Sequence, residues 1–260
     1  MGKEVKVKKE FNKKTFWKLT GVTAMFAAWS LASFLIVQLG IGNLINLLVY
    51  VGVPLADVNQ SVFLVVANIV AWILTILLVI GLPWLAFKNK TSPKDLGLGE
   101  WPAWCDFGWL GLGFVLYLVL TFVTTFISML LLSNVIDFNQ KQVTGFESIS
   151  TQSEYILAFI GLVIVAPIAE EVLFRGYLFG KLKKAGIKTW VAIVVTSLMF
   201  AVAHFQGNVG IDVFALSVVL CLLRVWSGSL WPSIMLHMLK NGIAYYFLFI
   251  NPSILSTIGG

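Results

Sequence analysis

Long apolar stretches separated by short polar ones dominate this chain. A helix needs about 20 mostly apolar residues to cross a bilayer, and several runs reach that length with few charges. Lipid-embedded chains satisfy their backbone polar groups as helices or closed barrels, and uninterrupted apolar runs of this kind are typical of helices. We therefore predict membrane-spanning helices near 19–39, 61–87, 107–133, 155–180, 189–205, 212–226 and 230–250.

Two segments leave the number of spans open. The run 212–226 is short for a full crossing and indicates a broken or tilted helix, with Asp212 as its N-cap residue. The uncharged stretch 41–56 is an extension of the first span, a re-entrant segment or an eighth span. The predicted fold class is an all-α polytopic transmembrane bundle of about seven to eight spans.

Composition agrees with a lipid environment. Hydrophobic residues make up 59% of the 260 residues and charged residues only 12%, with a mean hydropathy of +0.92. One water-soluble core cannot hide that much apolar surface. The ten tryptophans mostly flank the predicted spans, as interfacial anchors do.

The basic residues predict the orientation. With seven spans, fifteen of the eighteen lie on one side: in the tail 1–18, after the second and fourth spans, and at the end of the sixth. Only Lys141 lies opposite, while Arg175 and Lys240 fall within spans. The positive-inside rule then makes the N-terminus cytoplasmic. A full extra crossing by 41–56 would split the lysines between both sides, so we set it aside. The net charge of +6 is thus a topological signal, and we expect no nucleic-acid partner.

Two adjacent acids lie inside the fourth span. Glu170 and Glu171 occupy the apolar run AFIGLVIVAPIAEEVLFRGYLF, where one ionisable side chain costs about 2.5 to 3.5 kcal/mol. Arg175 stands four residues after Glu171, the spacing of an ion pair along one helix face. Glu170 points about 100° away on an ideal helix and is left without that partner. Pro167 is expected to kink this span and free carbonyls near the acids.

Both histidines also lie in apolar segments. Phe200 precedes His204 by four residues, and Asn241 follows His237 by four, so each histidine shares a helix face with a companion. A set of two carboxylates, two imidazoles and a carboxamide on three spans predicts a polar catalytic cavity. The structural alternative is a hydrogen-bonded staple between helices. Neighbouring Lys240 either pairs with the glutamates or snorkels toward the headgroups.

Three ordered motifs resemble a known family. EExxxR at Glu170 to Arg175, FxxxH at Phe200 to His204 and HxxxN at His237 to Asn241 are similar to the motifs of the CPBP family, the CAAX proteases and bacteriocin-processing or immunity proteins also called Abi. The string SPKDLGLGEW at 92–101 resembles a loop that precedes the family's core. The resemblance covers about 154–250 and implies a catalytic core there, after N-terminal spans and loops in 1–153.

The resemblance implies a role for each motif residue. Glu170 and His204 are expected to activate a water that attacks the scissile carbonyl. His237 and Asn241 are expected to donate hydrogen bonds to the tetrahedral oxyanion. Glu171 and Arg175 are expected to support and orient Glu170.

A metal-dependent version of the site stays open beside this one. Glu170, His204 and His237 form a two-histidine, one-glutamate set that suits zinc with water as the fourth ligand, whereas the alternative uses glutamate and no cofactor. The sequence contains no HExxH motif, because Phe-Gln-Gly-Asn follows His204. The common zinc-protease helix is therefore excluded.

The predicted function is that of an intramembrane endopeptidase in the cell membrane of a bacterium. Its expected partners are the lipid bilayer and a membrane-associated peptide or protein substrate. The alternative is a catalytically silent bacteriocin-immunity or scaffold protein of the same fold. A transporter that uses the glutamates and Lys240 as a relay is a third class, and the lack of an inverted sequence repeat argues against it.

Overall fold

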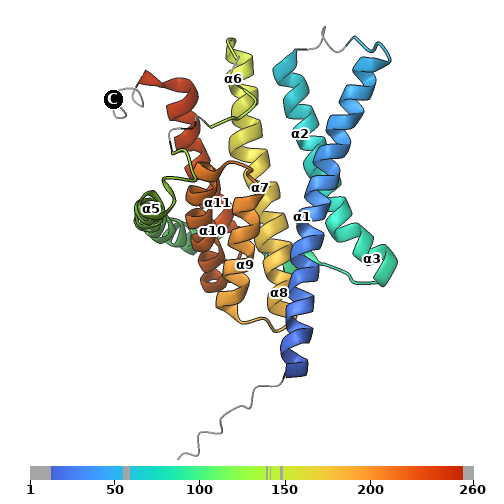
Figure 1. The fold of residues 1–260 in the computed structure, drawn as a ribbon, viewed down its shortest axis with the longest axis vertical. Helices are drawn as coiled ribbons and strands as arrows, with labels where there is room; N and C mark the ends of the chain where they lie inside the picture. The colour runs from blue at the N-terminus through green and yellow to red at the C-terminus, as the bar shows by residue number, and fades with distance from the viewer. Residues whose placement is uncertain (1–12, 55–58, 139, 141, 147–148, 254–260) are drawn as a thin grey trace, which may run out of the picture.

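Helices account for every regular element in the residues that the computed structural model describes, which are 13–54, 59–138, 140, 142–146 and 149–253. Figure 1 shows most of them running roughly along the long axis of the molecule. With η marking a π-helical segment, the elements are α1 (Lys13–Tyr50), α2 (Gln60–Ile76), η2 (Leu77–Gly81), α3 (Leu82–Phe87), α4 (Pro93–Leu96), α5 (Trp104–Leu132), α6 (Gln152–Phe159), η3 (Ile160–Val165), α7 (Ala166–Glu171), η4 (Val172–Leu178), α8 (Phe179–Lys184), α9 (Thr189–Val202), α10 (Gly207–Ser227), α11 (Trp231–Tyr245) and η5 (Tyr246–Ile250).

Six helical runs in this described part are long and apolar enough to cross a membrane. They confirm the all-α polytopic bundle. The predicted span 189–205 corresponds to α9, whose 14 residues are fewer than a full crossing needs. The six runs are Trp17–Tyr50, Gln60–Phe87, Trp104–Leu132, Gln152–Lys184, Gly207–Ser227 and Trp231–Ile250.

The first helix answers the question about the segment 41–56. Because α1 continues unbroken to Tyr50, the described part of this segment extends the first span. Tail residues 1–12, residues 55–56 and Lys141 lie outside the described residues. In Figure 1, α1 begins toward the end of the molecule where α8 ends, so the lysines of those two segments share one end of the bundle. Which side of the membrane this end faces stays a prediction.

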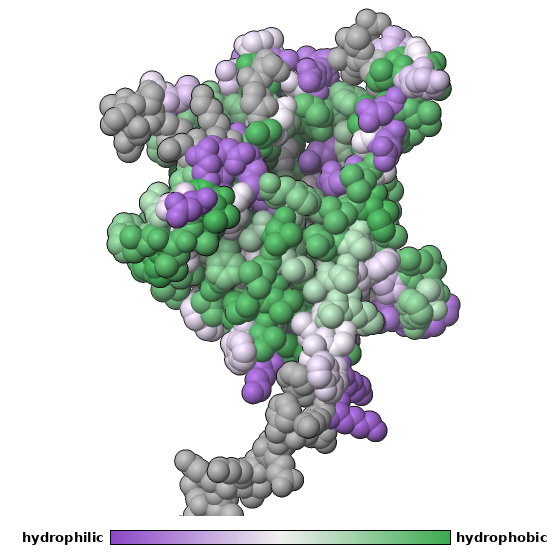
Figure 2. Space-filling model, in the orientation of Figure 1, coloured by the Kyte–Doolittle hydropathy of each residue, from purple (hydrophilic) through white to green (hydrophobic). Residues whose placement is uncertain are grey.

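The surface agrees with immersion in lipid. Figure 2 shows hydrophobic residues across the middle of this face and hydrophilic residues mostly toward its two ends. Large apolar side chains are exposed on several helices, among them Leu77, Phe122, Leu131 and Ile156. Outward-facing apolar side chains at this density are what a bilayer requires of a spanning helix.

The helix α10 lies at the centre of the C-terminal half and packs against α9, α5 and α11. Gly113 lets α5 approach closely, since a Cβ there would lie 2.7 Å from Leu223 Cδ1 and 3.0 Å from Leu236 Cδ2. One prediction is wrong: α10 begins at Gly207, after the N-cap residue Gln206, and Asp212 lies inside the helix. In lipid, a helix that includes Gly207 and Gly210 satisfies backbone groups that a loop would leave unpaired.

The two glutamates lie on a helical run that continues without a break from Gln152 to Lys184, called the rod below. Pro167 lies at the start of α7, directly after the π-helical segment η3. Proline lacks an N–H and its ring clashes with a regular helical turn, and a π-turn widens the helix at that point. The rod therefore continues past the proline without a break. Glu170 and Glu171, which follow the proline, lie inside the bundle as a result.

Candidate active site

A buried ion pair forms the centre of the site. Arg175 Nη1 donates to Glu171 Oε1 at 2.8 Å, and both side chains are fully buried. The predicted i,i+4 pair is thus present. His237 Nδ1 donates to the same carboxylate oxygen at 2.9 Å, which ties α11 to α7. Burial of these charges is tolerated because each has a close partner of opposite charge or a hydrogen bond.

The ring of Phe200 packs against the charged pair and against both histidines. The guanidinium carbon of Arg175 lies 4.3 Å from the ring centroid, a cation–π contact. The rings of His204 and His237 meet Phe200 edge to face, with centroids 4.8 and 5.7 Å away. Phe200, which is fully buried, therefore contacts three side chains of the candidate site.

Glu170 is the less constrained of the two acids. Its Oε2 lies 3.7 Å from His237 Nε2, which is too long for a direct hydrogen bond. Its side chain is 16% exposed, whereas that of Glu171 is fully buried. His237 thus lies between the two carboxylates, bonded to Glu171 and adjacent to Glu170. One water beside Glu170 Oε2 and His237 Nε2 can bind both atoms.

The position and tautomer of His204 follow from its bond to Phe200. Its Nδ1 lies 2.8 Å from the Phe200 carbonyl oxygen. A carbonyl only accepts, so Nδ1 carries the proton and the neutral ring presents a lone pair at Nε2. Phe205, with φ at 52°, turns the chain directly after His204. Within the described residues, no hydrogen bond or ion pair joins His204 to Glu170.

Asn241 forms a hydrogen bond to a backbone carbonyl oxygen that has no N–H donor within its own helix. In η3 the hydrogen bonds run five residues along the chain, and Ala166 N donates to Gly161 O. The corresponding partner of Leu162 O would be Pro167, which has no N–H. Asn241 Nδ2 donates to that oxygen at 2.9 Å. The second N–H of the carboxamide stays available for another acceptor.

A second polar cluster beside the site was not predicted as such. Lys240 Nζ lies 3.0 Å from Asp212 Oδ2, so its ion-pair partner is an aspartate on α10 and not a glutamate. Tyr117 Oη and Thr121 Oγ1 donate to Asp212 Oδ1 at 2.7 and 3.3 Å. The signal in the sequence was the charge complementarity of Asp212 and Lys240 within apolar segments. Nothing in the sequence indicated that the hydroxyls of Tyr117 and Thr121 would contact Asp212.

The proposed zinc ligands do not assemble into a metal site. Glu170 and His237 are adjacent, but His204 is bonded to Phe200. Across the part of the chain that is described, no group of three or more His, Cys, Asp or Glu residues is arranged to hold a metal ion. We therefore derive no reaction step through a metal.

Comparison with known proteins confirms the resemblance that the motifs carry. Residues 152–243 match the family described as type II CAAX prenyl endopeptidase Rce1-like. The chain is 29% identical over 184 residues to the membrane-embedded CAAX protease MroQ of Staphylococcus aureus, covering 66% of this chain and 69% of that protein. These matches support a membrane protease of the CPBP family.

Other comparisons are less informative. The chain is 30% identical over 98 residues to an uncharacterized 24.3 kDa protein of Escherichia coli, of which it spans 45%. No solved structure matches. All four residues of the ion-paired core and its aromatic contact, Glu171, Arg175, Phe200 and His237, lie within the region matched by the family.

Proposed function

We propose that this multi-pass membrane protein is an intramembrane endopeptidase of the CPBP type that hydrolyses a peptide bond in a membrane-associated peptide or protein. One observation carries the proposal: Arg175 and His237 both donate to one oxygen of Glu171, and Glu170 lies beside His237 without sharing in those bonds. A purely structural staple needs one carboxylate for this arrangement. The second one is then available for chemistry.

Glu170 is the proposed general base. It accepts a proton from a water whose oxygen attacks the scissile carbonyl carbon, and the proton then passes to the nitrogen of the leaving amine as the C–N bond breaks. His204 is the proposed second acceptor for that water, because its Nε2 presents a lone pair when Nδ1 donates to Phe200. Under this proposal the water donates one hydrogen bond to each group and transfers a single proton, to Glu170.

His237 and Asn241 are the proposed donors to the oxyanion. The Nδ1 proton of His237 is already donated to Glu171, so His237 can donate from Nε2 only as an imidazolium. Asn241 donates one N–H to Leu162 and has the other free for substrate. Under this proposal Glu171 and Arg175 are positioning residues that act through His237 and through the rod.

The substrate class is proposed from the relatives. MroQ carries the name of a CAAX protease, and the matched family is that of CAAX prenyl endopeptidases. The lysine- and asparagine-rich chain with short loops resembles a bacterial protein, for which we favour a peptide precursor, a bacteriocin leader or a pheromone over a prenylated protein. The proposed location is the bacterial cell membrane.

A catalytically silent immunity or scaffold protein is the second candidate. The observation in its favour is that Glu171, Arg175 and Asn241 all have structural partners, and that no direct bond joins Glu170 to His204 among the described residues. Such a protein keeps its binding or protective effect when Glu170 is replaced. An endopeptidase loses its activity.

The test is a cleavage screen in liposomes. The purified protein is reconstituted with a library of membrane-tethered peptides, and products are identified by mass spectrometry for wild type and Glu170→Ala, with bound metal measured on the same samples. We expect products from wild type only. Equal cleavage by both proteins rules out the role of Glu170, and a complete absence of products favours the silent alternative.

A further inference from the structure

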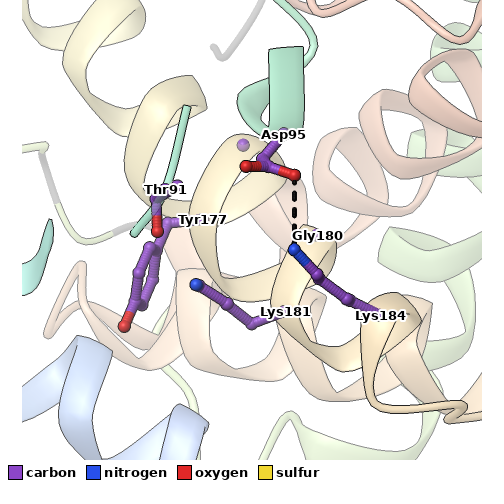
Figure 3. Close-up of a pocket in the computed structure, with 7 residues that line it drawn as sticks. Thr91, Asp95, Tyr177, Gly180, Lys181 and Lys184 are labelled. Carbon is purple, nitrogen blue, oxygen red and sulfur yellow. Dashed lines mark ion pairs between the residues drawn. The ribbon is translucent and has the colours of Figure 1, made fainter. Parts of the chain in front are cut away.

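A cavity of about 230 Å³ with both polar and apolar walls lies away from the glutamate and histidine residues, at the end of the rod where α8 finishes (Figure 3). It is a partly open cavity between Thr91 and Asp95 on one side and the last turns of η4 and α8 on the other. None of its lining residues belongs to the proposed active site. Its walls include Thr91, Asp95, Gly176, Gly180, Lys181 and Lys184.

Two glycines on the rod allow the wall of this cavity to form. A Cβ on Gly176 would lie 3.2 Å from Leu96 Cδ2, and a Cβ on Gly180 would lie 3.3 Å from the Asp95 carbonyl oxygen. With no side chain at either position, α4 lies directly on the rod. The other end of this loop is fixed by Leu230 N, which donates to Gly97 O at 2.9 Å. The cavity is therefore part of the packed structure.

Lys181 brings a buried positive charge into the cavity. The residue is only 7% exposed, and its Nζ donates to Asn89 Oδ1 at 2.9 Å. An ammonium group has three donors, and no carboxylate in the described residues forms an ion pair with this one. The ring of Tyr177, 5.5 Å from Nζ, is a weak substitute. A buried cation without a counter-charge is unfavourable until an anion binds.

Asp95 supplies that counter-charge only in part, because its close ion-pair partner is Lys184. Its Oδ2 accepts from Ser92 N at 2.9 Å and from Ser92 Oγ at 2.8 Å, and its Oδ1 lies 3.5 Å from Lys184 Nζ. The backbone hydrogen bond from Ser92, the bond from its hydroxyl and the charge of Lys184 lower the pKa of Asp95 to about 2. Asp95 is thus ionised but paired with Lys184, and Lys181 has no carboxylate within ion-pair distance among the described residues.

A hydroxyl on the same side of the cavity also lacks a partner. Thr91 Oγ1 is buried and makes no hydrogen bond in the described structure. Figure 3 shows the Thr91 hydroxyl and the Lys181 ammonium on one side of the cavity, with the Lys184–Asp95 pair on the other. An unpaired buried donor destabilises the protein, and a hydrogen bond to a ligand oxygen would remove that cost.

The surroundings identify where the ligand comes from. Trp84, Phe87, Trp101 and Trp104 are exposed on the segments that flank the cavity, and exposed aromatic residues beside a span mark the headgroup level. Lys88, Lys90 and Lys94 are exposed on the same connection. The anions concentrated at that depth are the phosphates of anionic phospholipids.

We propose that this cavity binds the phosphodiester headgroup of an anionic phospholipid. Lys181 Nζ and Thr91 Oγ1 donate to the phosphate oxygens, and Lys184 approaches from the rim. The inference concerns lipid recognition at the membrane surface and does not depend on peptide hydrolysis.

Thermal unfolding of the purified protein in a neutral detergent tests the proposal. Short-chain dihexanoyl phosphatidylglycerol is titrated, with dihexanoyl phosphatidylcholine and inorganic phosphate as separate arms, and Tm is recorded for wild type, Lys181→Met, Thr91→Val and Lys188→Met. Lys188 is exposed and outside the cavity, so its variant removes the same charge as a control. Thr91→Val is isosteric and removes a hydroxyl that has no partner, so it is expected to fold.

A saturable rise in Tm with phosphatidylglycerol is expected for wild type and Lys188→Met. The apparent affinity should fall about tenfold or more in Lys181→Met and measurably in Thr91→Val, because each loses a donor to the phosphate. The proposal is overturned if no saturable rise occurs, or if Thr91→Val and Lys181→Met respond as Lys188→Met does. A full response to inorganic phosphate alone overturns the lipid as the source of the anion, and an equal response to phosphatidylcholine overturns the selectivity for anionic lipids.

Discussion

His237 Nδ1 donates to Glu171 Oε1 across 2.9 Å, although 66 residues separate them in the chain. The same oxygen accepts from Arg175 Nη1. One carboxylate oxygen thus joins the rod 152–184 to α11 inside the bundle. The imidazole is left with only Nε2 facing Glu170, which is the geometry that the proposed mechanism uses.

Breaking the buried pair should destabilise the protein more than removing it. Arg175→Met leaves the Glu171 carboxylate buried with His237 alone, and we expect a loss of about 3–5 kcal/mol. The double variant Glu171→Gln with Arg175→Met should recover part of this loss, since no unpaired charge remains. Thermal unfolding in detergent measures both. A single variant as stable as wild type contradicts the role given to the pair.

The bond between Asn241 and Leu162 gives a coupled prediction. Asn241→Leu should cost about 1–3 kcal/mol, because the Leu162 carbonyl loses its donor while it stays inside the bundle. Pro167→Ala restores an N–H at the position where a π-turn would use it. The cost of Asn241→Leu should therefore be smaller in the Pro167→Ala background. Equal costs in the two backgrounds rule out this explanation of the asparagine.

The pair of Lys240 and Asp212 should also be coupled. Lys240→Met leaves Asp212 with only its two hydroxyl donors, and we expect a loss of about 1–2 kcal/mol, since both side chains are partly exposed. Adding Asp212→Asn should reduce the loss, because an amide needs no counter-charge and still accepts from Tyr117. Tm values of the two variants provide the comparison. A double variant that is less stable than Lys240→Met contradicts the ion pair.

Gly113 offers a test of the packing between α5 and α10. Gly113→Ala places a methyl group 2.7 Å from Leu223 Cδ1 and should destabilise the protein by about 1–3 kcal/mol. Gly111→Ala lies on the same helix, where a Cβ has no neighbour within 4 Å, and is the matched control. We expect that variant to be neutral or slightly stabilising. Equal effects of the two substitutions exclude close packing as the reason for Gly113.

Hydropathy predicted the six helices in the described part of the chain that are long and apolar enough to cross a membrane, because the length of an apolar run measures the property that the bilayer requires. It also predicted a span at 189–205, where α9 has only 14 residues. It was insufficient at the start of α10. The span was predicted to begin at 212 with Asp212 as its N-cap residue, whereas the helix begins at Gly207. Hydropathy also left the segment 41–56 open. The distribution of lysines argued against a full extra crossing there, but it did not distinguish an extension of the first span from a re-entrant segment.

The site residues followed from their motifs, but most of their partners did not. Spacing along one helix predicted the Glu171–Arg175 pair. Contacts between helices depend on rotation and tilt, which the sequence does not specify, so the bond from His237 to Glu171 and that from Asn241 to Leu162 were not anticipated. The role of Pro167 became clear only with the π-turn before it. The roles of the individual residues in catalysis stay predictions.

The most direct test of the central claim is the cleavage rate of Glu170→Gln on a substrate found in the liposome screen. The amide is nearly isosteric with the carboxylate and cannot accept the proton from water, so we predict a loss of about a hundredfold or more with an unchanged Tm. Glu100→Gln, on an exposed loop, is the control and should cleave at the wild-type rate. A Glu170→Gln protein that cleaves as fast as wild type contradicts the assignment of Glu170 as the base.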